Sequence, residues 1–185
     1  MFYTMKIAGL SRDLPLCPLN DDLYIAGFIM FGDVEITVKA AEELLKKAPA
    51  FDLIVTAESK GIPLAYEMAR QAGGVRYIVC RKEKKLYMRD VVQTEVDSIT
   101  TDHIQSLCID GADAALIRGK RILVVDDVIS TGESLRSMET LVEQAGGNIV
   151  ARMSVLAEGE AADRQDITFL EKLPLFRPDG TPIEG

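Results

Sequence analysis

The chain has 185 residues, of which 48% are hydrophobic and 27% are charged, and its formal net charge at pH 7 is −8. These values are ordinary for one globular domain with a hydrophobic core, and the negative charge disfavours general nucleic-acid binding, which needs a basic surface. The apolar runs are far shorter than the ~20 residues of a membrane-spanning helix, and the N-terminus shows no basic and apolar signal segment.

The cysteine and histidine content predicts reduced thiols and argues against a zinc site. The chain has 3 cysteines and 1 histidine, and no two cysteines are close in the sequence. An odd number without close pairs is typical of thiols that stay reduced in the cytoplasm, whereas zinc sites need clustered cysteine or histidine. We therefore expect a cytoplasmic protein without a metal ion held by its own side chains.

Helical and strand-like patterns alternate in two parts of the chain, one before residue 81 and one after residue 120. The helical runs carry apolar residues at helical spacing, and the strand-like runs are short and apolar. In chain order, the pattern predicts helix 33–48, strand 51–57, helix 62–74, strand 75–80, strand 121–127, helix 133–147 and strand 148–157. This alternation is typical of a parallel α/β sheet with helices on both faces.

Residues 81–120 and both ends of the chain do not follow this alternation. The segment 81–90 is rich in charge, 91–110 alternates loosely as a hairpin would, and 111–120 looks like a turn and a short linker. An insertion of this length in a compact domain is more often functional than not. We expect a single domain, residues 1–185, with a core at about 33–157 and a small hood formed by about 1–32 and 158–185.

The stretch RILVVDDVISTGESL, residues 121–135, places two adjacent acids at the end of a predicted core strand. Open α/β sheets bind ligands beyond the carboxyl ends of their strands, which is where Asp126 and Asp127 are expected. The following residues lead into a helix, whose first N–H groups have no partner within the helix and attract anions. Because hydroxyls add donors and glycine allows close approach, the turn predicts a phosphate site made by Ser130, Thr131, Gly132, Glu133 and Ser134.

Three other interpretations of this stretch are possible. Asp127 could be a surface residue, with Ser130 or Thr131 serving only as a helix cap. A nucleotide-binding P-loop requires the pattern G-x-x-x-x-G-K-[ST], which the chain lacks. A phospho-acceptor receiver domain also has an acidic pair, but its pair is expected early in the chain, with a further aspartate and a lysine at later strand ends.

Residues 122–134, ILVVDDVISTGES, resemble the phosphoribosyl-pyrophosphate motif of the type I phosphoribosyltransferases. That motif has four apolar residues, two acids, two apolar residues and a turn containing threonine, glycine and a hydroxyl residue. The resemblance implies that Asp126 and Asp127 are catalytic, facing the ribose hydroxyls of the substrate, and that the turn binds its 5′-phosphate. It also implies the type I phosphoribosyltransferase fold, an α/β fold with a parallel core sheet flanked by helices and a hood from the termini.

Two further segments resemble pyrophosphate-binding parts of the adenine phosphoribosyltransferases, a branch of this family. TAESKGIP (56–63) resembles their Ser-Arg-Gly loop with lysine in place of arginine, and RKEKKL (81–86) resembles their RKRGKL segment. Lysine binds phosphate as a point charge but lacks the bidentate geometry of arginine. Taken alone, the first segment could be a turn and the second a solvated loop. The resemblance implies pyrophosphate binding by Ser59, Lys60, Gly61, Arg81, Lys82 and Lys85.

The parts that would select the base match the adenine branch less well. AGFIMFGDV (26–34) resembles the stretch PGVVFRDI that helps to hold adenine, but Gly32 stands where arginine is expected. FLEKLPLF (169–176) resembles the tail that completes the hood. The hairpin expected at 87–109 has Thr100 where adenine enzymes usually have glutamate, and it looks closer to bacterial xanthine phosphoribosyltransferases. The candidates for base binding, with core packing as the alternative for both phenylalanines, are Ala26, Phe28 and Phe31.

The resemblance implies a purine phosphoribosyltransferase of purine salvage, which transfers the 5-phosphoribosyl group from phosphoribosyl pyrophosphate to a purine nitrogen and releases pyrophosphate. Adenine is the favoured base, and xanthine or hypoxanthine and guanine are the alternatives. Mg²⁺ is the expected cofactor, held mainly by the substrate pyrophosphate. The family also implies a homodimer, with no membrane or nucleic-acid partner. A hypothesis from another class is a regulator that binds phosphoribosyl pyrophosphate or a purine nucleotide without catalysis.

Overall fold

A computed structural model of the chain describes residues 1–94 and 106–183. Its centre is a 5-stranded sheet in the order β10-β9-β8-β4-β5, in which every neighbouring pair is parallel. The strands of this sheet are β4 (Leu53–Ala57), β5 (Arg76–Cys80), β8 (Arg121–Ile129), β9 (Asn148–Glu158) and β10 (Thr168–Leu173). The predicted α/β fold with a parallel core sheet is thereby confirmed.

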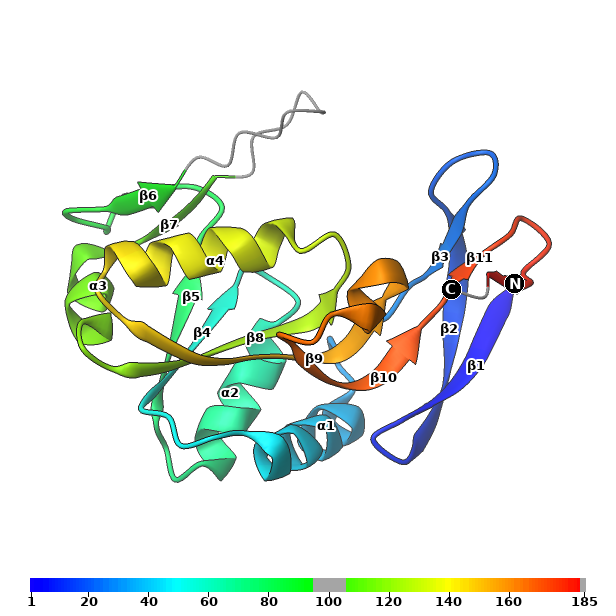
Figure 1. Ribbon diagram of the computed structural model, residues 1–185, viewed down its shortest axis with the longest axis horizontal. Coiled ribbons are helices and arrows are strands. Elements are labelled where there is room, and N and C mark those ends of the chain that lie inside the picture. The colour runs from blue at the N-terminus through cyan, green and yellow to red at the C-terminus, as the bar shows by residue number, and fades with distance from the viewer. Residues whose placement is uncertain (95–105, 184–185) are drawn as a thin grey trace.

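Helices cover both faces of the central sheet, as Figure 1 shows. α1 (Val34–Lys47) and α2 (Ile62–Gln71) lie on one face, and α3 (Gly111–Ile117) and α4 (Glu133–Gln144) lie on the other. Successive strand residues face opposite sides, so Leu123 packs in the core beside α1 and α2 while Val124 packs in the core beside α4. Burial on both faces explains why the parallel strands are continuous apolar runs.

Both ends of the chain contribute strands to a second, antiparallel sheet, which we call the hood sheet. Its order is β1-β2-β3-β11-β12, and it stands beside β10 at one end of the central sheet (Figure 1). Tyr3 on β1 and Phe176 on β11 pack edge to face with ring centroids 4.8 Å apart, which joins the two ends of the chain. The strands are β1 (Phe2–Ile7), β2 (Leu10–Pro18), β3 (Tyr24–Ala26), β11 (Leu175–Phe176) and β12 (Pro182–Ile183).

One strand within the segment expected to form the hood belongs instead to the central sheet. β10 pairs in parallel with β9, with Leu173 opposite Glu158. A short 3-10 helix, η1 (Gly159–Asp163), precedes β10, and after β10 the chain passes through Pro174 into β11. The sequence pattern could not assign β10 because its outer positions are exposed at the edge of the sheet and its run is only partly apolar.

The segment 81–120 contains a short ribbon and a helix. β6 (Val92–Thr94) and β7 (Leu107–Ile109) pair antiparallel, with Thr94 opposite Leu107. They lie where the hairpin was predicted; residues 95–105, including Thr100, are outside the described part of the chain.

The prediction of a turn and linker at 111–120 was wrong, because Gly111–Ile117 form the helix α3. The carboxylate of Asp110 accepts a hydrogen bond from the backbone N–H of Ala112 at 2.9 Å and caps this helix, while Ala114 and Ile117 are buried against the sheet. A helix of 7 residues is too short to show a clear apolar period in the sequence. Within residues 1–94 and 106–183, no helix is long and apolar enough to cross a membrane.

Candidate active site

The acidic pair lies within β8, close to its carboxyl end. β8 continues to Ile129, whereas the sequence predicted its end at residue 127. Asp127 is only 3% exposed and Asp126 is partly exposed. The backbone N–H of Asp127 donates a hydrogen bond to Asp126 Oδ1 at 2.9 Å. The two carboxylates are therefore held by the strand itself, at the edge of the sheet where ligands of α/β proteins bind.

Burial and a like charge alter the protonation of Asp126. Burial first, and then the charge of Asp127, raise the pKa of Asp126 to about 8, while Lys60 acts in the opposite direction. The Nζ atom of Lys60 lies 3.2 Å from Asp127 Oδ2. Among the described residues, that buried oxygen accepts no well-aligned hydrogen bond. A buried acceptor without a well-aligned donor is suited to a hydroxyl of a bound sugar.

Gly61 brings the loop after β4 against the acidic pair. A Cβ atom built at Gly61 would lie 2.3 Å from Thr56 Oγ1 and 3.0 Å from Asp126 Oδ1, so no side chain fits there. This close approach puts Lys60 over Asp127 and explains glycine in the S-K-G stretch. The fully buried hydroxyl of Thr56, which has no partner among the described residues, is a feature of the site that the sequence did not reveal.

The turn after β8 has the geometry expected of an anion-binding site. Gly132 has φ of +80° and precedes the first residue of α4, so the free N–H groups at the helix start face outward from a tight turn. Ser130 and Thr131 are exposed. A Cβ atom at Gly132 would lie 2.8 Å from Arg164 Nη1, which places a guanidinium beside the turn. Arg164 comes from the segment after η1, and no sequence motif pointed to it.

The basic segment after β5 is joined to the loop after β4 through Glu58. Arg81 Nε lies 3.3 Å from Glu58 Oε2, and the backbone N–H of Lys82 donates to the same oxygen at 3.1 Å. Arg81 and Lys82 are thus placed next to the loop that carries Ser59 and Lys60. Lys85 is directed elsewhere, with its Nζ 2.6 Å from the carboxylate of Glu83. Glu58 is a further residue that sequence reasoning missed.

The predicted base-binding segment leads from the hood sheet to α1. Ala26 and Phe28 are buried, at 4% and 3% exposure, and Phe28 packs in the hydrophobic core together with Leu156 and Leu173. Phe31 is 53% exposed. Of the two phenylalanines, Phe31 alone has a ring with room to contact a ligand without rearrangement of the core.

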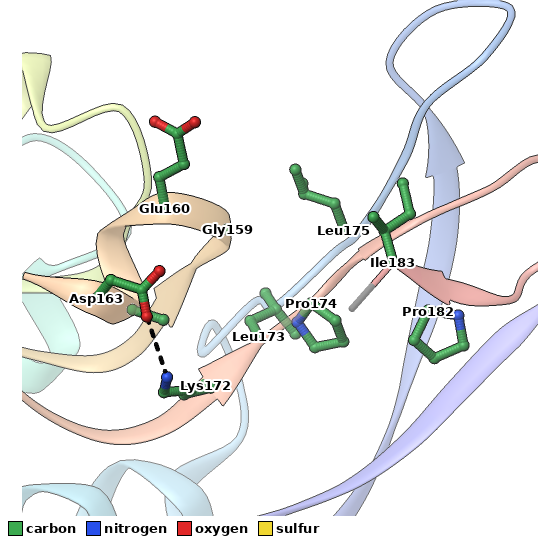
Figure 2. A pocket seen from close by; sticks show the side chains of 10 residues that line it. Gly159, Glu160, Asp163, Lys172, Leu173, Pro174, Leu175, Pro182 and Ile183 are labelled. Atoms are coloured by element: carbon green, nitrogen blue, oxygen red, sulfur yellow. Dashed lines mark hydrogen bonds and ion pairs between the residues drawn. The ribbon is translucent and has the colours of Figure 1, made fainter. Parts of the chain in front are cut away.

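A separate cavity of about 570 Å³ lies between η1 and the hood sheet, and Figure 2 shows its lining. Leu173, Leu175 and Ile183 supply apolar walls, and Lys172 pairs with Asp163 at 3.4 Å on one side. None of the predicted site residues lines this cavity. It adjoins the carboxyl end of β9, the strand next to β8.

The described residues include no group of three or more histidine, cysteine, aspartate or glutamate side chains able to hold a metal ion. Asp126 and Asp127 are only a pair, and Lys60 occupies the space next to Asp127. A divalent cation would fit this site only if another group, such as a diphosphate, supplied most of its ligands.

Comparison with known proteins gives consistent matches. The model of the phosphoribosyl transferase domain matches residues 34–173. The chain is 31% identical over 154 residues to the adenine phosphoribosyltransferase of Acetivibrio thermocellus, which covers 79% of this chain and 84% of that protein. It is also 31% identical over 131 residues to the hypoxanthine/guanine phosphoribosyltransferase of Methanococcus voltae, covering 70% of this chain and 66% of that protein.

A regulatory protein and a solved structure are also similar to the chain. The purine biosynthesis transcriptional repressor PurR of Bacillus subtilis is 30% identical over 114 residues, which cover 62% of this chain and 39% of that protein. The crystal structure of adenine phosphoribosyltransferase from Thermoanaerobacter pseudethanolicus superposes with a TM-score of 0.70 at 24% identity, covering 86% of this chain and 95% of that chain. This structural likeness supports the fold.

The matched residues 34–173 contain the acidic pair, the turn after it and both basic loops, and they form the parallel sheet that brings these parts together. The chain belongs to the phosphoribosyltransferase family.

Proposed function

We propose that the protein is a purine phosphoribosyltransferase of purine salvage, with adenine as its favoured base. It transfers the 5-phosphoribosyl group of phosphoribosyl pyrophosphate to a purine nitrogen and releases pyrophosphate. The observation that carries the proposal is the acidic pair within β8, which Lys60 faces from 3.2 Å and which the glycine-containing start of α4 follows. The similarity to named adenine phosphoribosyltransferases supports the choice of adenine.

Each part of the site has a separate task in this reaction. The turn Ser130–Ser134 binds the 5′-phosphate with its N–H groups and hydroxyls, and this remote binding orients the reacting carbon. Asp126 and Asp127 position the ribose and stabilise the positive charge that grows on it as the pyrophosphate leaves. The cations that receive the leaving pyrophosphate are Lys60, Arg81 and Lys82, with Ser59, Gly61 and Lys85 as the further candidates.

We propose Mg²⁺ as the cofactor, bound mainly through the pyrophosphate of the substrate. Its chemistry is to neutralise charge that builds up on the departing diphosphate. The carboxylates of Asp126 and Asp127 are the side chains that would approach Mg²⁺ from the protein.

We further propose that the enzyme is a cytoplasmic homodimer. Ile29, Phe31, Val34 and Tyr66 are large apolar side chains that are each more than half exposed. Val34 and Tyr66 line one shallow groove between α1 and α2, a site that a second copy of the chain would cover. The cytoplasm is where the free thiols of Cys17, Cys80 and Cys108 would stay reduced.

A turnover assay with adenine, xanthine, hypoxanthine and guanine tests the function. A wrong base leaves a buried polar group unpaired at about 1–3 kcal/mol, so we expect adenine to exceed the 6-oxopurines by roughly 5- to 150-fold in kcat/KM. Preference for a 6-oxopurine would contradict the adenine assignment and favour the alternative suggested by the Methanococcus voltae relative.

The same assay separates the enzyme from a regulator, the function named for the Bacillus subtilis relative. No turnover with any purine, together with measurable binding of phosphoribosyl pyrophosphate, would contradict the enzymatic function. Exhaustive treatment with a chelator should abolish turnover, and added Mg²⁺ should restore it.

A further inference from the structure

Glu158 ends β9, between the phosphate turn and the strand that leads into the hood sheet. β9 pairs with β8 so that Ala157 is opposite Ile129, which puts Glu158 level with Ser130, the first residue of the phosphate turn. On its other side, Glu158 is opposite Leu173, the last residue of β10 before the chain enters the hood sheet. The end of β9 therefore sits between the phosphate turn and the hood.

Glu158 is only partly exposed, and no hydrogen bond or ion pair is formed by its side chain within the described residues. Burial raises the pKa of Glu158 above its usual range, and the charge of Lys60 opposes this shift. Lys60 is shared with Asp126 and Asp127, so its charge is not available to Glu158 alone. A partly buried carboxylate without a donor has free capacity to accept a proton or a hydrogen bond.

Other charged groups near the end of β9 have partners of their own or point elsewhere. Asp163 on η1 pairs with Lys172 on β10 at 3.4 Å. Glu160 extends away from that pair on the far side of η1, as Figure 2 shows, and it is exposed. Glu158 is thus a partly buried carboxylate at the end of β9 that forms no ion pair within the described residues.

The residues around Glu158 pack next to the part of the site that is predicted to bind the purine. Gly159 and Glu160 line the cavity between η1 and the hood sheet. Leu156 and Leu173, its neighbours along and across the strands, pack in the same core cluster as Phe28 of the predicted base-binding segment. A base held between that segment and the ribose would lie against the end of β9.

We propose that Glu158 is the general base that removes the proton from the reacting nitrogen of the purine. As the bond between that nitrogen and C1′ of the ribose forms, the bond from C1′ to the pyrophosphate oxygen breaks. The proton passes to a carboxylate oxygen of Glu158, the electron pair of the former N–H bond forms the new bond from nitrogen to C1′, and pyrophosphate leaves with the electrons of the broken C1′–O bond. This inference rests on the proposed transfer reaction.

Glu158→Gln tests the proposal, with Glu160→Gln as the matched control. The control changes an exposed carboxylate two residues further along the chain, which lines the cavity beside the hood sheet. We expect Glu158→Gln to lower kcat by roughly 10²- to 10⁴-fold, the usual range for a lost general base, and Glu160→Gln to stay within about 3-fold of the parent. The thermal shift caused by phosphoribosyl pyrophosphate with Mg²⁺ should be equal in all three proteins.

The pH profile distinguishes a proton acceptor from a structural residue. In the parent, kcat/KM should fall as the pH is lowered through the pKa of Glu158, because the protonated carboxyl cannot accept a proton. Glu158→Gln should lack this acid limb, whereas Glu158→Asp, which retains a carboxylate, should keep it with reduced kcat. Any pH dependence of kcat/KM that comes from titration of Asp126 would be the same in the parent and in both Glu158 variants.

The proposal is overturned if Glu158→Gln retains the parent's kcat and acid limb, or if Glu160→Gln loses as much activity. It is also overturned if Glu158→Gln loses activity only through failure to bind phosphoribosyl pyrophosphate. Failure of the proposed function itself would look different, because the parent would then turn over no purine.

Discussion

Asp127 is the residue on which the proposed chemistry depends most directly. It is 3% exposed, and its buried Oδ2 atom pairs with Lys60 but accepts no well-aligned hydrogen bond among the described residues. A residue kept for stability alone would leave fewer polar atoms unpaired at the edge of a sheet. The local geometry therefore favours a ligand-binding role.

We expect Asp127→Asn to lower kcat at least ~10²-fold, a typical size for a lost transition-state contact. Its melting temperature should remain near that of the parent, because the amide has nearly the same shape. Steady-state kinetics and thermal unfolding measure the two quantities. A variant that unfolds early but keeps its specific activity would show that the acidic pair is structural.

The protonation of Asp126 predicts how stability changes with pH. Its pKa of about 8 lies well above the usual value of 3.8, so between these values the folded chain binds a proton that the unfolded chain has lost. The free energy of unfolding should therefore decrease as the pH rises from about 4 to 8. Below pH 4 the group is protonated in both states and contributes no pH dependence.

Asp126→Asn should remove this pH dependence. At about pH 3.5, where the carboxyl is protonated in both the folded and the unfolded chain, the variant and the parent should unfold at similar temperatures, because asparagine resembles the neutral carboxyl. At pH 8.5 the variant should be more stable by at least ~1 kcal/mol, or roughly 2–4 °C in Tm. Thermal unfolding at both pH values measures the difference in Tm between the variant and the parent. The same difference in Tm at the two pH values would contradict the raised pKa of Asp126.

At the scale of elements, ion pairs of Arg12 connect the hood sheet with the start of α1. From β2, its Nε and Nη2 atoms donate to the carboxylate of Asp33 at 2.7 and 3.1 Å, and Nη2 also donates to Glu35 at 2.9 Å. Asp33 in turn caps α1 by accepting from the N–H of Ile36. The arginine holds the pKa of Asp33 below its usual range. These contacts lie at the C-terminal end of the segment that carries the predicted base-binding residues.

Arg12→Lys should loosen the base side of the site because lysine cannot form the bidentate pair. The pair is partly exposed, so we expect a loss of only about 0.5–1 kcal/mol in stability. The KM for the base should rise several-fold, while the KM for phosphoribosyl pyrophosphate stays unchanged. Lys39→Gln, which breaks an exposed pair with Glu42 on α1, is the matched control. Equal changes in the KM for the base and the KM for phosphoribosyl pyrophosphate would contradict the assignment of this segment to base binding.

At the scale of the whole molecule, the exposed apolar side chains near α1 and α2 predict self-association. Val34 is 73% exposed and begins α1. Val34→Glu should prevent dimerisation without weakening the helix, because an acidic residue in the first turn complements the helix dipole. Leu116→Glu on α3 is the control, since Leu116 is 40% exposed on the opposite face of the sheet.

Light scattering at micromolar concentration measures the result. We expect the parent and Leu116→Glu to show twice the chain mass of 20.3 kDa, and Val34→Glu to show the single-chain mass. A parent that stays at the single-chain mass over the whole concentration range would contradict the homodimer.

The sequence by itself determined the order of helices and strands in the core and the position of the acidic motif. These features depend on short-range periodicity and on residues adjacent in the chain, so the sequence predicts β4, β5, β8 and β9 and the helices α2 and α4 close to their observed limits. Where such signals were weak, prediction failed: the short helix α3 was read as a linker, and the edge strand β10 was assigned to the hood.

Only the tertiary structure decided which distant side chains meet. Lys60 reaches Asp127, Glu58 joins Arg81, and Arg164 lies beside Gly132 because parallel strands bring their carboxyl ends to one edge of the sheet. The position of Glu158 likewise follows from strand register, since β9 meets β8 and β10 only in the folded sheet. A single sequence carries no local signal for such contacts, because they depend on pairing between segments that are remote along the chain.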